Sequence, residues 1–413
     1  MENFTLLLKK YADFIVRVGV NPQPGQTLII NCCLEAAPLA RLCVRSAYEA
    51  GARDVLVNWS DNDVSRSRME LGSEEALTDF KSYQLRRYLD YAESEGGVCV
   101  LHLLADDPEV YAGLDGAKIS RVNAAQRKFM APWREYTMND RVQWSIAAMP
   151  SAPWAKKIFP ELDEAAAIEK LWQLIFDVCR VTGGDPVGEW KAHLDRLTSL
   201  KDKMNALDLE SVHFESGNGT DLTVGIADKA VWESAASVSE KGVVFLPNIP
   251  TEEVFTAPHK DKVNGIVYGT KPYVFNGQLI KGFHVTFKDG RVVEHGADEG
   301  AELLGRLLDT DEGARSIGEV ALVPASSPIN RSGALFYSTL FDENAACHIA
   351  FGASYPGTTE SGTRLSKDEL LARGMNQSAI HEDVMVGAED SHITGKCRDG
   401  RTVELFRDGV WVL

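Results

Sequence analysis

Side chains that bind metal ions gather in the C-terminal part of this chain. They are carboxylates, two histidines and a tyrosine, at Glu252, Glu253, Glu319, Glu343, His348, Tyr355, His381, Glu382 and Asp383. Carboxylates can bridge two divalent ions, and imidazoles can complete the coordination of each ion. The residue types therefore predict a site for two divalent cations, of the kind that metal-dependent hydrolases use.

His381 and Asp383 have the spacing of two ligands on one strand. Residues 378–387 are predicted to form a strand, in which residues two apart face the same side. His381 and Asp383 would then point together, with Glu382 turned away. A solvated surface strand is the alternative, because a pattern this short recurs by chance.

Two other candidates lie in apolar surroundings. His348 is flanked by small and apolar residues, and a lone histidine of this kind is more often a hydrogen-bonded core residue than a ligand. Glu319 begins an otherwise apolar strand, where burying a carboxylate is costly unless it is paired or bound to a metal. Glu319 therefore favours a metal site, whereas His348 alone does not.

The remaining candidates are expected in loops and turns. Three prolines within residues 246–258 keep the segment of Glu252 and Glu253 out of a helix, and a solvated acidic loop is the alternative. Glu343 alone indicates a solvated acid at a turn. Tyr355 precedes a Pro-Gly turn, where its phenol could stabilise a developing oxyanion.

Four short segments together resemble a known enzyme family. PTEEVFTAP from Pro250, GEVALV from Gly318, DENAACHIAFG from Asp342 and HED from His381 are similar to segments of the metalloaminopeptidases of peptidase family M29, of the aminopeptidase T, aminopeptidase S and PepS type. The resemblance runs along essentially the whole chain. It implies that Tyr355 is an active-site residue and that the metal ligands are Glu253, Glu319, Glu343, His348, His381 and Asp383.

The resemblance also implies an activity and an assembly. The expected reaction is removal of amino acids from peptides that have a free N-terminus, by a water that two metal ions activate. A general base is required as well, and Glu252 is the candidate because it adjoins a ligand. Sites of this composition accept zinc, cobalt, manganese or magnesium. A homodimer is expected.

Two other functions stay open at this point. His348, His381 and Asp383 could form the facial triad of a mononuclear non-haem Fe(II) dioxygenase, although Glu253 and Glu319 then have no role as ligands. In the other alternative the acidic and histidine side chains are surface groups of a non-catalytic binding protein. That alternative leaves Glu319 in its apolar strand unexplained.

Composition limits the partners and the compartment. The net charge of −17 and the pI near 5.0 argue against binding to nucleic acid or to an anionic membrane. The seven cysteines form no CxxC pair, which indicates a reducing compartment. A signal-like leader and a long apolar run are both lacking. We therefore expect a cytoplasmic protein.

The order of elements predicts two domains that position these residues. Short apolar strands at 27–33, 54–59, 98–104 and 143–148 alternate with helices, which predicts an α/β domain with a mostly parallel sheet. A Gly-Gly-Asp-Pro break between two long helices sets the boundary, giving domains 1–184 and 185–413. The second domain is predicted to be a strand-rich α+β domain that carries all the candidate ligands.

Overall fold

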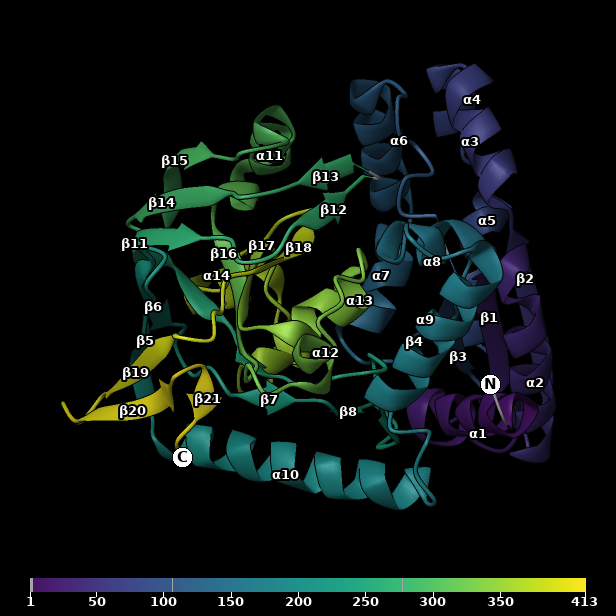
Figure 1. Cartoon of the computed structure of the whole chain (residues 1–413), viewed down its shortest axis with the longest axis horizontal. Helices are drawn as coiled ribbons and strands as arrows, with labels where there is room; N and C mark the ends of the chain where they lie inside the picture. Colours follow the sequence, from purple (N-terminus) through teal and green to yellow (C-terminus); the bar gives the residue numbers. More distant parts are fainter. Residues whose placement is uncertain (1–2, 106, 277) are drawn as a thin grey trace. The chain divides into compact units, whose positions relative to one another are not determined.

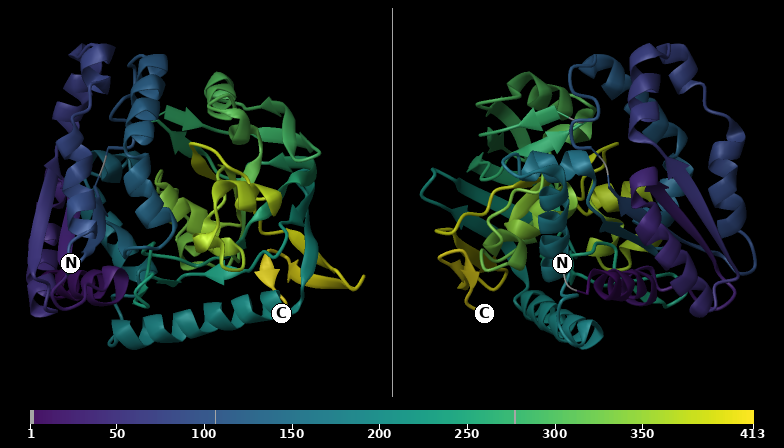
Figure 2. Two further views of the ribbon diagram at one scale, coloured as in Figure 1. Left: turned by 180° about the vertical axis from the view of Figure 1, so that it is seen from behind. Right: turned by 45° about the vertical axis from the view of Figure 1, so that its right-hand side comes forward.

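The computed structural model describes residues 3–105, 107–276 and 278–413, which form two compact units (Figure 1). One unit contains Met1–His193 and Ala236–Pro250, and the other contains Leu194–Ala235 and Thr251–Leu413. The division falls inside α10 (Pro186–Ala206), which is one unbroken helix in Figures 1 and 2. That residues 1–184 and 185–413 fold as separate domains stays a prediction.

A four-stranded parallel sheet organises the first unit. Its strand order is β2-β1-β3-β4, with bounds β1 Thr27–Cys33, β2 Asp54–Ser60, β3 Val98–Leu104 and β4 Trp144–Ala148. Most of β1 and β3 is buried, as expected for strands that are covered on both faces. The predicted α/β fold with a parallel sheet is confirmed.

Helices surround this sheet in the first unit. Their bounds are α1 Phe4–Phe14, the π-helix η1 Ile15–Val20, η2 Leu34–Ala36, α2 Ala37–Glu49, α3 Asn62–Leu71, α4 Glu74–Thr78, α5 Ser82–Ala92, α6 Gly116–Phe129, α7 Ala131–Met138, α8 Ala152–Ile158 and α9 Glu164–Val178. The short strands β8 (Ser237–Val238) and β9 (Val244–Phe245) pair with each other in the same unit.

An antiparallel sheet of eight strands forms one layer of the second unit. Its order is β15-β14-β11-β6-β5-β19-β20-β21, with bounds β5 Leu209–Glu215, β6 Asp221–Ile226, β11 Pro258–Tyr268, β14 His284–Lys288, β15 Arg291–Gly296, β19 His392–Cys397, β20 Thr402–Arg407 and β21 Val410–Trp411. Neighbouring strands pair antiparallel throughout, and β5-β6, β14-β15 and β19-β20-β21 are consecutive in the chain. This confirms the predicted strand-rich C-terminal fold.

A second antiparallel sheet carries the candidate ligands. Its order is β18-β17-β16-β10-β7, with bounds β7 Glu233–Ser234, β10 Val254–Thr256, β16 Ile317–Leu322, β17 His348–Gly352 and β18 His381–Met385. One face packs into the core of the unit, where Phe351 stacks on Phe287 of β14 with ring centroids 6.4 Å apart. The opposite face is available for the site.

Short elements complete the second unit. They are β12 Tyr273–Phe275, β13 Gln278–Ile280, α11 Ala301–Leu308, η3 Glu312–Arg315, α12 Pro328–Arg331, α13 Thr339–Asp342, η4 Glu343–Ala345, η5 Pro356–Thr358, η6 Gly362–Arg364 and α14 Lys367–Ala372. Across the described ranges of the chain, no helix has both the length and the apolar character to cross a membrane.

The strand predicted from residue 378 begins later, at His381. The preceding residues bond to a loop instead of a strand, since the Ser378 hydroxyl and the Ala379 amide both donate to the carboxylate of Asp311. These bonds keep the segment outside the sheet. The strand is therefore shorter than its apolar pattern indicated, but it keeps His381 and Asp383.

Candidate metal centre

The alternation of strand residues brings the candidate ligands to one face of the five-stranded sheet. Glu319 on β16 lies opposite Ala350 on β17, and Ala350 lies opposite Asp383 on β18. Residues that are opposite each other in neighbouring strands share a face. The intervening residues Ile349 and Val384 point into the core.

Small side chains on the same face leave room between the ligands. Ala350 separates Glu319 from Asp383, and Ala321 lies opposite His348. Each alanine contributes only a methyl group where a larger side chain would fill the face. This face of the sheet thus forms a mostly buried floor on which carboxylates and imidazoles converge.

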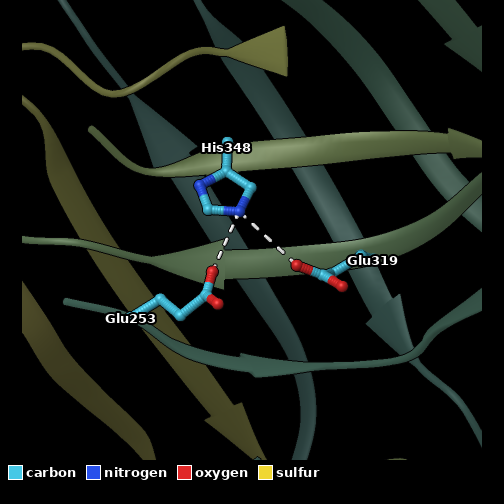
Figure 3. A group of neighbouring side chains, drawn as sticks. All are labelled: Glu253, Glu319 and His348. Carbon is cyan, nitrogen blue, oxygen red and sulfur yellow. Dashed lines mark ion pairs between the residues drawn. The ribbon is translucent and has the colours of Figure 1, made fainter. Parts of the chain in front are cut away.

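Two groups of ligand atoms form on this floor, and each lies within 4.8 Å. In the first, His348 Nε2 lies 3.2 Å from a Glu253 oxygen and 3.4 Å from Glu319 Oε1 (Figure 3). In the second, His381 Nε2 lies 3.5 Å from Glu319 Oε2 and 3.4 Å from Asp383 Oδ1. The two oxygens of Glu319 therefore face two different histidines.

The spacing of these atoms fits metal binding. Ligands about 2.1 Å from one ion at tetrahedral angles lie about 3.4 Å from each other. The observed separations of 3.2 to 3.5 Å match this value. Among the described residues, His348 Nε2 and Asp383 Oδ1 are also buried without a hydrogen-bond partner of good geometry. Buried polar atoms normally have a partner, so the residues fit a metal ion.

Backbone carbonyls orient both histidine rings. His348 Nδ1 lies 3.2 Å from the Ala346 carbonyl, and His381 Nδ1 lies 2.7 Å from the Ala353 carbonyl. A carbonyl only accepts, so each Nδ1 donates and the lone pair of the neutral ring is at Nε2. This arrangement is the usual support for a metal-ligating histidine.

The electrostatics of the floor reflect several acidic side chains that are buried close to two histidines. Burial raises the pKa of Glu319 to about 7. Burial would lower the pKa of His381, but the charges of Asp383 and Glu319 outweigh it and raise the pKa to about 9. Burial would lower the pKa of His348, but its close contacts with the carboxylates of Glu253 and Glu319 outweigh burial and raise the pKa. Such a site attracts cations.

Glu343 lies close to the two groups without being part of either. It is buried in η4 beside α13, and burial together with the charges of Asp383 and Glu253 raises its pKa well above the usual value. Its Oε1 lies 3.3 Å from the side-chain amide of Asn344. The structure thus brings Glu343 to the site, and its role as a ligand stays a prediction.

Tyr355 follows β17 and lies against a candidate ligand. Its ring centroid is 4.4 Å from that of His381 and 6.4 Å from that of Phe255. Burial, and then the charge of Glu319, raises the pKa of the phenol well above its usual value. The hydroxyl therefore stays protonated and can donate a hydrogen bond.

Glu252 and Glu253 point in different directions. The Glu253 carboxylate joins the first group, whereas the Glu252 carboxylate lies 4.0 Å from Arg196 Nη2 and is 3% exposed. Glu252 is therefore a buried acid paired with an arginine of α10. Its proposed role as general base stays a prediction.

Several supporting groups could not be found from the sequence. The carbonyls of Ala346 and Ala353 have no residue-specific signal, since every residue has a carbonyl. Asn344 accepts from the backbone amide of Glu252, a residue 92 positions away. Only the folded chain reveals such a contact.

Two buried groups of potential metal ligands on one sheet are the arrangement that a metal-dependent enzyme requires. The family model described as thermophilic metalloprotease (M29) matches residues 4–411. The chain belongs to this family, and it is a peptide hydrolase. The resemblance inferred from the four short segments is confirmed.

Relatives of known name match along the whole chain. Aminopeptidase 2 of Geobacillus stearothermophilus is 45% identical over 100% of this chain and 99% of its own length. Aminopeptidase T of Thermus aquaticus is 41% identical over the full length of both chains. The solved structure titled wild-type AmpT from Thermus thermophilus superposes with a TM-score of 0.91, at 37% identity, over 99% of this chain and 100% of that chain.

Proposed function

We propose that this chain is an aminopeptidase that releases N-terminal amino acids from peptides at a site for two divalent metal ions. The names of its full-length relatives support the activity. The observation that carries the two-ion proposal is the position of Glu319, whose two oxygens face His348 and His381 separately. A carboxylate placed in this way can bridge two ions.

Charge balance supports two ions more than one. The floor holds four carboxylates, from Glu253, Glu319, Glu343 and Asp383. Two divalent ions would balance all four carboxylates in their ionised form, whereas with one ion the acids of raised pKa, such as Glu343, would have to keep their protons. Uncompensated buried charge is costly. We therefore assign Glu253 and His348 to one ion, His381 and Asp383 to the other, and Glu319 to both, with Glu343 as a further ligand.

The protein side chains then position the ions and stabilise the charge that develops on the substrate. Bound divalent ions would supply an activated water and polarise the peptide carbonyl. Glu319 fixes the spacing of the two ligand groups, and the backbone carbonyls keep Nε2 of each histidine directed at its group. The protonated Tyr355 hydroxyl donates to the oxyanion that develops on the carbonyl.

Proton transfer is assigned to Glu252. A base must take the proton of the attacking water and return it to the leaving amine. Glu252 adjoins a proposed ligand and is buried, and its charge is paired with Arg196. The variant Glu252→Gln should keep its metal and lose turnover. Turnover equal to that of the wild type would remove Glu252 from the mechanism.

Three further properties belong to the same proposal. The native ions are zinc, cobalt, manganese or magnesium, because all four accept carboxylate and imidazole ligands. The protein acts as a homodimer in the cytoplasm on peptides with a free N-terminus. Sedimentation analysis of the purified chain tests the dimer directly.

The alternative of a mononuclear Fe(II) dioxygenase has less support. It uses only His348, His381 and Asp383, which leaves the contacts of Glu253 and Glu319 with His348 unused. The full-length relatives are also named as aminopeptidases. Oxygen consumption with Fe(II), without peptide hydrolysis, would restore this alternative.

A substrate panel tests the proposed function. Metal-stripped protein is assayed on aminoacyl-p-nitroanilides and on their N-acetylated versions, with and without cobalt, zinc or manganese. Metal-dependent cleavage of the free-amine substrates alone is expected. Equal cleavage of the acetylated substrates would contradict exopeptidase action, and no cleavage with any metal would overturn the proposal.

A further inference from the structure

Asn344 connects two segments of the candidate metal centre that are far apart in sequence. It is fully buried in η4, next to Glu343. Its Oδ1 accepts from the backbone amide of Glu252 at 2.7 Å, and its Nδ2 lies 3.3 Å from Glu343 Oε1 and 3.2 Å from the Leu340 carbonyl. One side chain thus holds the backbone beside Glu253 and the carboxylate of Glu343.

The orientation of this amide follows from the chemistry of its partners. A backbone N–H only donates, so the atom that faces Glu252 must be the oxygen. The other two partners are a carbonyl and a carboxylate, and both accept. The Asn344 side chain is therefore satisfied in one orientation only, which fixes the distance between the two segments it joins.

No other residue type of this size supplies the same bonds. Aspartate keeps the acceptor for the Glu252 amide but offers no donor to Glu343. Leucine or alanine removes one hydrogen-bond partner from a buried amide and one from a buried carboxylate, which is costly. The site therefore uses both functional groups of an asparagine at this position.

We propose that Asn344 is a positioning residue of the metal centre, which sets the Glu253 segment and the Glu343 carboxylate against the ligand-bearing face at the same time. This inference rests on the proposed function, because it concerns the same ligands. Residues that hydrogen-bond to metal ligands typically change metal affinity by about 10- to 100-fold when they are replaced. The same effect is expected here.

The variants Asn344→Ala and Asn344→Asp separate the acceptor role of the side chain from its donor role toward Glu343 and Leu340. The first removes both the acceptor and the donor. The second keeps the acceptor for Glu252 and removes the donor to Glu343, so it decides the question alone if the alanine variant does not fold. Ser327→Ala is the matched control. The Ser327 hydroxyl donates to the backbone carbonyl of Asn344 at 2.6 Å, and Ser327 is as buried as Asn344.

The experiment is a Co(II) titration of the metal-free, full-length chain in competition with a chromophoric chelator, with the Co(II) absorption spectrum recorded at saturation. We expect both Asn344 variants to bind Co(II) about 10- to 100-fold more weakly, with an altered spectrum. Ser327→Ala should keep the affinity and spectrum of the wild type, although it loses a buried hydrogen bond to the same residue.

The outcomes separate this inference from the proposed function. Wild-type affinity and spectrum in either Asn344 variant would overturn the positioning role, and so would an equal loss in Ser327→Ala, which would indicate a general packing effect. A wild-type chain that takes up no Co(II) would contradict the proposed function itself. Hydrolysis and Co(II) binding by the wild type, together with unchanged Asn344 variants, would overturn only the inference.

Discussion

Two sheets of this molecule carry a histidine among buried residues, and the two environments move the pKa of the ring in opposite directions. His102 lies on β3 of the parallel sheet, where burial lowers its pKa to about 4. His381 lies on β18 of the five-stranded sheet, where the charges of Asp383 and Glu319 outweigh burial and raise its pKa to about 9. Burial acts on both rings, and the opposite pKa shift of His381 comes from the nearby carboxylates of Asp383 and Glu319.

The strand neighbours explain the contrast. His102 lies between Asn31 and Ile146 in register, which are neutral side chains. His348 and His381 lie on antiparallel strands whose partners bring Glu319 to the same face. A buried histidine is thus a neutral core residue by default. Acidic residues on the same face of the sheet, which for His381 are Asp383 on its own strand and Glu319 on β16, are what turn it into a candidate ligand.

The largest effect is expected from Glu319, which both histidines of the second sheet share. The variant Glu319→Gln should lose more activity than the about 10²- to 10³-fold typical of a single oxyanion donor, because it weakens both ligand groups. Metal content by atomic emission and turnover of a free-amine substrate measure this. Glu319→Gln protein that keeps full metal content would contradict a bridging role. His102→Gln is the control from the other sheet and should keep both metal and activity.

Tyr355 tests whether the ring beside His381 takes part in the reaction. Tyr355→Phe removes one hydroxyl and should lower kcat by about 10²- to 10³-fold with little change in metal content. Steady-state kinetics measure this change. Tyr273→Phe is a matched control, since Tyr273 is a buried tyrosine of the same unit whose hydroxyl has no hydrogen-bond partner among the described residues. Equal rates in the two variants would exclude a role for the Tyr355 hydroxyl.

Metal affinity should depend on pH in the direction set by the raised pKa of His381. The metal-free ring is protonated below about pH 9, and a metal ion binds the neutral ring. Affinity should therefore rise with pH by about tenfold per unit for each proton released, and level off above about pH 9. Isothermal titration at several pH values measures the slope. Affinity that is constant from pH 6 to 9 would argue against histidine ligands.

His102 should affect stability with the opposite sign. Its folded pKa of about 4 lies below the ordinary value of 6.5, so the unfolded chain binds the proton first as the pH falls. Stability is unaffected above pH 6.5 and falls by at most about 3 kcal/mol as the pH drops to about 4. Urea unfolding of the wild type and of His102→Gln measures the difference, which should grow toward low pH. A difference that is independent of pH would contradict the lowered pKa.

The elements of the fold could largely be predicted from the chain itself. The strand at Thr27–Cys33 and the helix that follows it at Ala37–Glu49 agree with the predicted alternation of short apolar strands and helices. The π-helix at Ile15–Val20 could not be predicted, because a hydrophobic pattern does not distinguish its wider hydrogen bonding from that of an α-helix. The start of β18 was predicted three residues too early for a different reason, because it depends on hydrogen bonds to Asp311, which is remote in the sequence.

The candidate site divides in the same way. The types of the ligands and the shared face of His381 and Asp383 follow from composition and strand alternation. Which of Glu252 and Glu253 is the ligand does not follow from the sequence. It depends on which carboxylate faces His348 and which faces Arg196.

The sequence by itself determined the family, the α/β and strand-rich halves, and the kinds of atoms available for chemistry, because these depend on residue type and local spacing. The tertiary structure decided which histidines meet carboxylates, that Glu319 faces two of them, and that Asn344 joins Glu252 to Glu343. These contacts link residues that are distant in the chain. Strand register and long-range packing set their distances, and neither is encoded in any local pattern.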